Sequence, residues 1–207
     1  MNKPIIIIGN GGHALVITEI LIQNHRKILG YTAPEEEKNN FGLPYLGTDE
    51  VVLKYNSQEV DLAMGIGSIE PNNIRARIFK EFKEKGYHFT SCIHPKAIIS
   101  DTATLSEGVQ VMAGAIIQPF VQIHNNTIIN TGASIDHECS IGENVHIAPG
   151  AVLSGNVHIE SNCHIGTGAT VIQGIHIGAN SMVAAGAVVV NNIGYNCKVM
   201  GVPAKEV

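Results

Sequence analysis

The sequence predicts a mixed fold: a small N-terminal α/β (Rossmann-like) domain at residues 1–92, followed by a parallel β-helix at residues 93–207. Two observations predict it. A strand, a glycine turn and a helix open the chain, and a six-residue apolar repeat fills its second half. The chain has 207 residues, is 44% hydrophobic and contains no tryptophan, which fits a soluble protein whose second half has a thin aliphatic core.

Charge and targeting signals narrow the function classes. The net charge is −5 and no basic run is present, which argues against nucleic acid as the main partner. No apolar run approaches the roughly 20 residues that cross a bilayer, and the first residues do not have the shape of a signal peptide. We therefore expect a cytoplasmic protein that is not inserted in a membrane.

The first strand is predicted at Lys3–Ile8, which is apolar enough to be buried in a parallel sheet. It runs into the turn Gly9–Ala14 and then a helix with Leu15, Val16, Ile20 and Leu21 on its apolar side. Free backbone N–H groups converge at a helix N-terminus, so this turn is a candidate anion site. The sequence of this turn also fits the dinucleotide-binding fingerprint G-x-G-x-x-A.

The dinucleotide interpretation lacks its acidic residue, which should end the second strand and bind a ribose. That strand, at Lys27–Tyr31, continues into Thr32-Ala33-Pro34. Only about 90 residues precede the repeat, too few for a full two-half domain. A unit that binds one nucleoside diphosphate is favoured, and a glycine turn that only packs the helix on the sheet remains the alternative.

The other N-terminal elements follow from local patterns. A polar loop at 35–40 precedes a short helix near Thr48–Tyr55. A third strand is predicted at Val60–Gly67, a helix at Pro71–Lys85 and a fourth strand at Tyr87–Cys92. The carboxyl ends of parallel strands meet at one edge, so Gly65–Ser68 should lie beside the first glycine turn.

The repeat begins at Ile93, and every sixth residue from there to Val189 is Ile, Leu or Val, without insertion. The residue four positions later is usually small. A period of six suits a short strand that ends at a corner, and three such faces close a coil of about 18 residues whose neighbours pair as parallel strands. Glycine or asparagine occupies many of the expected corners, namely Gly114, Asn126, Gly132, Gly150, Gly168, Asn180 and Gly186.

His137 lies at an expected corner, where its imidazole can point outward, and Glu138 beside it could orient the ring. One coil further along the chain, the register places Gly155 directly above His137. Acyl transfer from a thioester needs a base and donors for the developing oxyanion. This corner is therefore the candidate for the chemistry.

Four other histidines share the last position of a hexad and form two vertical pairs, His146 with His164 and His158 with His176. The outward position favours solvated surface or contacts between subunits for His158, His164 and His176. No histidine pair has a third ligand at suitable spacing, so no metal site is expected.

The Gly-x-Gly-Gly-His turn at 9–13, the Gly-Ile-Gly-Ser loop at 65–68 and the Ile-His-Pro entry at 93–95 together resemble one subfamily of hexapeptide-repeat sugar acyltransferases. It contains the sialic acid O-acetyltransferases and the nucleotide-4-amino-sugar N-acetyltransferases of the bacillosamine-pathway type. The resemblance implies a left-handed β-helix, a homotrimer, acetyl-CoA as co-substrate and a sugar nucleotide held by the N-terminal domain.

The same resemblance implies roles for individual residues. His137 corresponds to the general base and Glu138 to its orienting carboxylate. The implied acetyl-CoA contacts are His146, as a donor to the acetyl carbonyl, with Gly155, Thr167, Ala185 and Lys205. The implied sugar-nucleotide contacts are Gly11, Gly12, His13, Gly67, Ser68 and Asn130.

The implied reaction is N-acetylation of the 4-amino group of a nucleotide-linked 4-amino-4,6-dideoxy sugar. UDP is the nucleotide that the resemblance favours. The paired acidic residues that contact the base in the nearest amino-sugar enzymes are replaced here by the segment Tyr31–Glu35, which leaves the base open. Three alternatives remain: O-acetylation of sialic acid or a related sugar, a trimeric scaffold that binds a nucleotide without catalysis, and a dehydrogenase.

Overall fold

The computed structural model describes residues 3–68 and 74–207, which form two compact units. Residues 3–67 and 74–95 make the N-terminal unit, and Ser68 with residues 96–207 makes the second. Each unit is described by itself. The start of the predicted helix at Pro71 lies outside the described residues.

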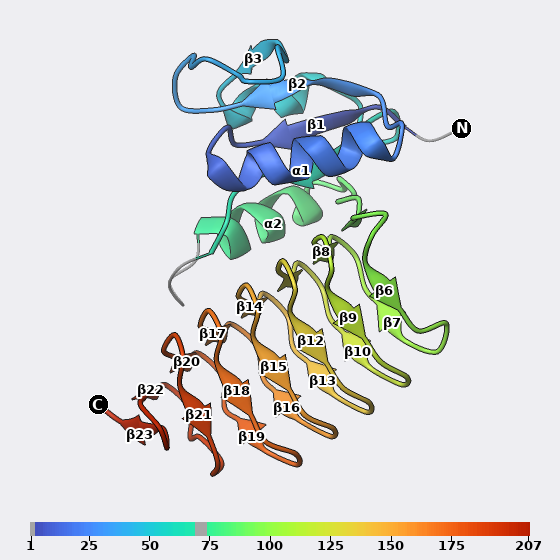
Figure 1. Cartoon of the computed structure of the whole chain (residues 1–207). Coiled ribbons are helices and arrows are strands. Elements are labelled where there is room, and N and C mark those ends of the chain that lie inside the picture. The colour runs from blue at the N-terminus through green and yellow to red at the C-terminus, as the bar shows by residue number, and fades with distance from the viewer. Residues whose placement is uncertain (1–2, 69–73) are drawn as a thin grey trace. The chain divides into compact units, whose positions relative to one another are not determined.

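A four-stranded parallel sheet forms the centre of the N-terminal unit. Its strands are β1 (Ile5–Ile8), β2 (Ile28–Thr32), β3 (Tyr45–Gly47) and β4 (Asp61–Met64), in the order β3-β2-β1-β4. Figure 1 labels the first three. All four isoleucines of β1 are at most 1% exposed. A strand buried on both faces needs such an uninterrupted apolar run, which confirms the prediction for Lys3–Ile8.

Three helices accompany this sheet: α1 (Gly12–Gln23), the 3₁₀ helix η1 (Asp49–Lys54) and α2 (Ile74–Glu84). The core side of α1 is formed by Ala14, Ile17, Thr18, Ile20 and Leu21. The sequence prediction was wrong for Val16, which is 39% exposed. Residues 14, 17, 18 and 21 share one face at helical spacing, whereas position 16 points away from it.

Two elements differ from the sequence prediction. Strand β3 was not predicted, because three residues are too short to show alternation. The fourth strand predicted at Tyr87–Cys92 is reduced to a single bridge between Leu62 and Phe89, followed by β5 (Cys92–Ile93). Tyr87 instead packs its ring edge-on against Phe82 and donates its hydroxyl hydrogen to the Val52 carbonyl.

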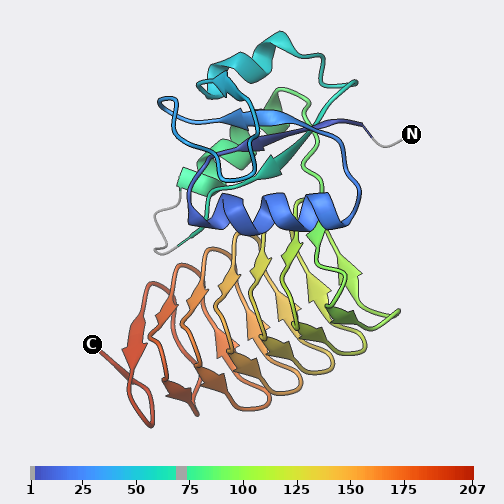
Figure 2. The same cartoon turned by 45° about the horizontal axis from the view of Figure 1, so that its top comes forward.

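The second unit is a left-handed parallel β-helix of two-residue strands, stacked coil upon coil (Figures 1 and 2). The first face contains β6 (Ile98–Ile99), β9 (Ile116–Ile117), β12 (Ser134–Ile135), β15 (Val152–Leu153), β18 (Thr170–Val171) and β21 (Val188–Val189). The second face contains β7 (Thr104–Leu105), β10 (Gln122–Ile123), β13 (Ser140–Ile141), β16 (His158–Ile159) and β19 (His176–Ile177). The third face contains β8 (Gln110–Val111), β11 (Ile128–Ile129), β14 (His146–Ile147), β17 (His164–Ile165), β20 (Met182–Val183), β22 (Lys198–Met200) and β23 (Lys205–Glu206).

The register of the repeat is the one that the sequence predicts. Ile129 pairs with Ile147, and Ile147 with Ile165, in steps of one coil. From Val111 to Val189 every hexad aliphatic residue is at most 3% exposed, so these side chains form the core of the prism. Their burial is the main stabilising contribution in this unit.

The corners use left-handed backbone conformations. Positive φ recurs at every sixth position from 108 to 186, filled by Gly108, Gly114, Phe120, Asn126, Gly132, Glu138, Asn144, Gly150, Asn156, Asn162, Gly168, Gly174, Asn180 and Gly186. All seven predicted Gly and Asn corners are confirmed. Glycine adopts this conformation without a Cβ clash and asparagine tolerates it. Phe120 and Glu138 are the exceptions, and they occupy the same corner in consecutive coils.

Candidate active site

His137 and Glu138 lie at the corner that joins β12 to β13, between the first and second faces. His137 Nδ1 is 3.0 Å from Glu138 Oε2, and the His137 N–H donates to Asp136 Oδ1 at 2.8 Å. A carboxylate only accepts, so Nδ1 carries the hydrogen and Nε2 keeps its lone pair. Both side chains are more than half exposed. The pair therefore presents an imidazole that Glu138 orients through Nδ1, which leaves Nε2 as the nitrogen not used by Glu138.

Gly155 lies directly above this imidazole. A Cβ at Gly155 would lie 2.6 Å from both Cε1 and Nε2 of His137, so no other residue fits while the ring keeps this position. The Gly155 carbonyl accepts from Gly174 N–H, and within the described residues the Gly155 N–H donates no backbone hydrogen bond. A free amide thus lies next to the base, where an oxyanion needs a donor.

His146 lies on the third face, in β14, and is 8% exposed. Asn130 Oδ1 accepts from Thr131 N–H at 2.7 Å, which turns Asn130 Nδ2 toward His146 Nε2 at 3.0 Å. His146 Nε2 is therefore the acceptor, and Nδ1–H donates to the Ser68 carbonyl at 2.6 Å. The structure thus brings together Asn130, His146 and Ser68. In this arrangement both ring nitrogens of His146 are used, and neither is presented as the donor to an acetyl carbonyl that the sequence resemblance implies.

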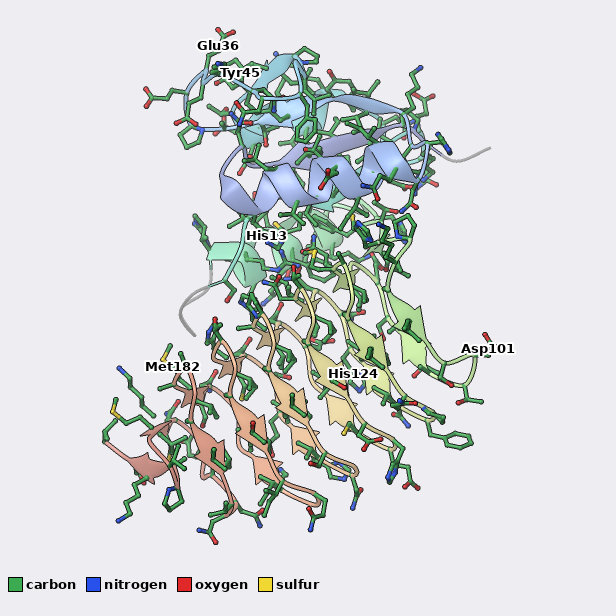
Figure 3. The ribbon with its side chains drawn as sticks, in the orientation of Figure 1. His13, Glu36, Tyr45, Asp101, His124 and Met182 are labelled. Atoms are coloured by element: carbon green, nitrogen blue, oxygen red, sulfur yellow. The ribbon has the colours of Figure 1, made fainter. Side chains whose placement is uncertain are left out.

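The predicted vertical pairs of histidines are present. His146 packs edge-on against His164, with ring centroids 4.9 Å apart, and burial lowers the pKa of His164. His158 pairs with His176 on the second face, where His176 Nε2 is 3.0 Å from Glu160 Oε1. These last two border an open groove of about 520 Å³ that also contains His124, labelled in Figure 3. None of the predicted site residues lines that groove.

One chain does not bring His137 and His146 together. His137 occupies the corner between the first and second faces, and His146 lies on the third face, opposite that corner. The other predicted acetyl-CoA contacts are divided in the same way. Thr167, between β17 and β18, and Ala185, between β20 and β21, are exposed and lie one coil apart at the corner between the third and first faces, away from the corner of Gly155. Lys205 is exposed in β23.

The glycine turn of the N-terminal unit has the geometry of an anion site. Gly11 is the N-cap of α1 without a side-chain cap, and a Cβ at Gly11 or Gly12 would meet nothing within 4 Å. The first N–H groups of a helix have no intrahelical acceptor and attract anions. His13, in the first turn of α1, is labelled in Figure 3.

The loop after β4 lies beside this turn, as predicted. A Cβ at Gly67 would lie 3.4 Å from His13 Cβ, and one at Gly65 would lie 2.8 Å from the Ile8 carbonyl oxygen. The structure therefore brings together Gly11, Gly12, His13 and Gly67, whereas Ser68 belongs to the second unit.

The sequence prediction missed two residues at this edge. Arg75 is 1% exposed, and its Nη1 donates to the Ile66 carbonyl at 2.7 Å, so it holds the Gly65–Gly67 loop from behind. Burial lowers the pKa of Arg75 to about 9. Asp49 Oδ1 accepts from Thr32 Oγ1 at 2.5 Å at the end of β2. Both residues come from other segments, so no local pattern indicates them.

Among the described residues, no group of three or more His, Cys, Asp or Glu side chains could hold a metal ion. No helix in that part of the chain is long and apolar enough to cross a membrane.

Comparison with known families gives matches in both units. Residues 4–82 match the model of the PglD N-terminal domain. Residues 120–155 match the model of the bacterial transferase hexapeptide (six repeats), and residues 156–190 match that of the hexapeptide repeat of succinyl-transferase.

Solved structures resemble the whole chain. The acetyltransferase domain of PglB from Neisseria gonorrhoeae FA1090, in complex with acetyl coenzyme A, is 32% identical with a TM-score of 0.93, over 100% of both chains. PerB from Caulobacter crescentus, in complex with CoA and GDP-perosamine, is 35% identical with a TM-score of 0.91, over 99% of this chain and 97% of that one. WeeI from Acinetobacter baumannii AYE, at 22% identity and a TM-score of 0.82, shares the fold over 100% of both chains.

Proposed function

Because the chain belongs to the family of hexapeptide-repeat sugar N-acetyltransferases that includes PglB and PerB, we propose that it transfers the acetyl group of acetyl-CoA to a nucleotide-linked 4-amino-4,6-dideoxy sugar. It is an acyltransferase by this membership. The observation that carries the proposal within this chain is the His137–Glu138 pair beneath Gly155. The imidazole of His137, the carboxylate of Glu138 and the Gly155 N–H, which has no backbone acceptor among the described residues, lie together at one corner.

The reaction follows from that geometry. His137 Nε2 accepts a proton from the 4-amino group as its nitrogen attacks the thioester carbonyl, and Glu138 stabilises the resulting imidazolium. The Gly155 N–H donates to the oxyanion. Collapse of the tetrahedral adduct breaks the carbon–sulfur bond, and the CoA thiolate takes up the proton from His137. The products are the amide and free CoA.

We propose a homotrimer in which each site lies between two copies. His137 and Gly155 would come from one copy, and His146, Asn130, Thr167 and Ala185 from its neighbour. The first face runs between the two corners concerned. Its outward column has four aliphatic side chains, including Ile98 at 64% and Val152 at 41% exposure, with Ser134 and Thr170 between them. Burying that column around a threefold axis would bring the corner of His137 against the adjacent copy.

The acceptor's diphosphate is proposed to bind the N–H groups at Gly11, Gly12 and His13, with Gly67 alongside. UDP is the base favoured by the sequence resemblance. GDP is the competing base, since PerB was solved with GDP-perosamine. O-acetylation of sialic acid would use the same base and donors and remains the second candidate function.

One panel separates these acceptors. Purified protein is mixed with acetyl-CoA and, in turn, with UDP-, dTDP- and GDP-linked 4-amino sugars and free sialic acid, and free thiol release is followed. We expect release with one nucleotide-linked amino sugar and none with sialic acid. Release only with sialic acid would select O-acetylation, and release with no acceptor would favour a non-catalytic scaffold.

The assignment of the base is tested by His137→Ala. We expect kcat to fall by about 10²- to 10⁴-fold, as for loss of a general base, with acetyl-CoA affinity nearly unchanged. His158→Ala is the matched control, because this exposed histidine lies on the second face outside the site. Turnover by His137→Ala within a few fold of the native rate would remove His137 from this role.

A further inference from the structure

The sheet of the N-terminal unit changes direction at β1. The chain runs from β1 to β2 and β3 on one side and then crosses to β4 on the other, giving the order β3-β2-β1-β4. Open α/β sheets bind ligands outside the carboxyl ends of the strands at such a switch point. The Gly9–His13 turn and the Gly65–Gly67 loop both lie there.

The end of β2 borders the same point. Thr32, its last residue, pairs with Ile8 of β1, and its carbonyl accepts from Gly9 N–H at 2.9 Å. A sheet that binds a nucleotide at this place uses an acidic residue at the end of the second strand to bind the ribose. Residues 33 and 34 are Ala and Pro, and the acidic residues that follow, Glu35, Glu36 and Glu37, are exposed in the loop beyond the end of the strand.

A more distant segment supplies the carboxylate. Ala33 N–H donates to the Gly47 carbonyl, which joins the end of β3 to the end of β2, and Asp49 follows two residues later. The fully buried Thr32 donates its hydroxyl hydrogen to Asp49 Oδ1 at 2.5 Å. Asp49 is only partly buried, and its Oδ2 has no hydrogen-bond partner within the described ranges.

A second contact fixes this edge. Asn39, in the loop between β2 and β3, donates from Nδ2 to Asn10 Oδ1 of the glycine turn at 2.8 Å, and its own Oδ1 accepts from the N–H groups of Phe41 and Leu43. The loop is thereby tied to the turn. The Asp49 carboxylate is thus held at the β2 side of the predicted diphosphate site.

We propose that Asp49 binds the ribose of the acceptor's nucleotide, its carboxylate accepting from the vicinal hydroxyl groups while Thr32 fixes its orientation. This inference rests on the proposed function and specifies which nucleotides the site takes, namely ribonucleotides. A carboxylate has about four lone-pair sites, so Oδ1 can serve Thr32 while Oδ2 accepts a ribose hydroxyl. A 2′-deoxyribose lacks one of the two donors.

Binding of UDP and GDP is compared with that of dUDP and dGDP by titration calorimetry on the full chain. For the base that binds, we expect the native protein to prefer the ribonucleotide by about tenfold, the value of one hydrogen bond to a charged group. Asp49→Asn should reduce this preference to about twofold or less and weaken the ribonucleotide alone. Glu50→Gln, an exposed neighbour on the same helix, should leave the preference unchanged.

Thr32→Val gives an independent reading, because it keeps the carboxylate but removes the group that orients it. We expect an intermediate loss of the ribose preference with a native circular dichroism spectrum. Two results would overturn the assignment of Asp49 and leave the proposed nucleotide site standing. One is equal affinity of the native protein for the ribonucleotide and the 2′-deoxyribonucleotide, and the other is an Asp49→Asn variant that keeps the native preference for the ribonucleotide. Failure of all four nucleotides to bind would overturn the nucleotide site of the proposed function together with it.

Discussion

Glu138 has a backbone conformation that the other corners, except Phe120, assign to glycine or asparagine. Its φ is 60°, and a residue with a Cβ pays about 1–2 kcal/mol for that conformation. Strained residues of this kind persist where function requires the side chain. In the proposed mechanism, the 3.0 Å contact between Glu138 Oε2 and His137 Nδ1 supplies such a requirement.

Removing that strain should separate stability from activity. We expect Glu138→Asn to raise the free energy of unfolding by about 1 kcal/mol, because asparagine tolerates the left-handed region, and to lower kcat by about tenfold or more. Chemical denaturation and thiol release measure the two quantities. Glu138→Gln keeps the strain and loses the charge, so it should lose activity without gaining stability.

Four asparagines at one corner of successive coils form a ladder of side-chain hydrogen bonds. Asn126, Asn144, Asn162 and Asn180 stack one coil apart, and each Nδ2 donates to the next Oδ1 at 2.8–3.1 Å. Each asparagine thus supplies a tolerated left-handed backbone and one bond to each neighbour. The ladder connects successive coils along the corner between the second and third faces.

A pair of substitutions at Asn144 measures both contributions. Asn144→Gly keeps the backbone conformation and loses two hydrogen bonds, for which we expect a cost of about 1–2 kcal/mol. Asn144→Ala adds the strain of a Cβ in the left-handed region, about 1 kcal/mol more. Thermal unfolding should rank native, Gly and Ala in that order, with Asn156→Gly, an exposed corner outside the ladder, close to native.

At the scale of the whole molecule, the separation of His137 from His146 requires a second copy for any site that uses both. Mixed assemblies of the proposed trimer test this. His137→Ala and His146→Ala subunits are each expected to be inactive, but a one-to-one mixture reassembled from both should regain about a quarter of the native activity, since one interface in four combines two intact halves. A mixture as inactive as its components would contradict a shared site.

Much of the β-helix and of the placement of its candidate residues could be predicted because the hexad register converts sequence number into position. It placed Gly155 above His137 and His146 beside His164, as the structure has them. The same register held a signal that the sequence prediction left unused. His137 and His146 are nine residues apart, half of an 18-residue coil, and therefore lie on opposite sides of the prism.

The N-terminal unit was less predictable because its edge is assembled from distant segments. Asp49 reaches β2 only because β3 pairs with it, and Arg75 supports Ile66 only because α2 packs on the sheet. Neither contact has a fixed sequence spacing. Strand β3, with three residues, carried no periodic signal of its own.

Because the repeat has no insertion, the β-helix of this enzyme can change its length in steps of one whole coil. Removing residues 156–173 would delete one whole coil, set Gly174 in the left-handed place of Asn156 and move Ala185 into the place of Thr167. His137, Glu138 and Gly155 would keep their positions, while the far end of the prism would approach by one strand spacing, about 4.8 Å. The end of the prism with the proposed acetyl-CoA contacts can thus change in length by whole coils, while the proposed catalytic corner at His137 stays as it is.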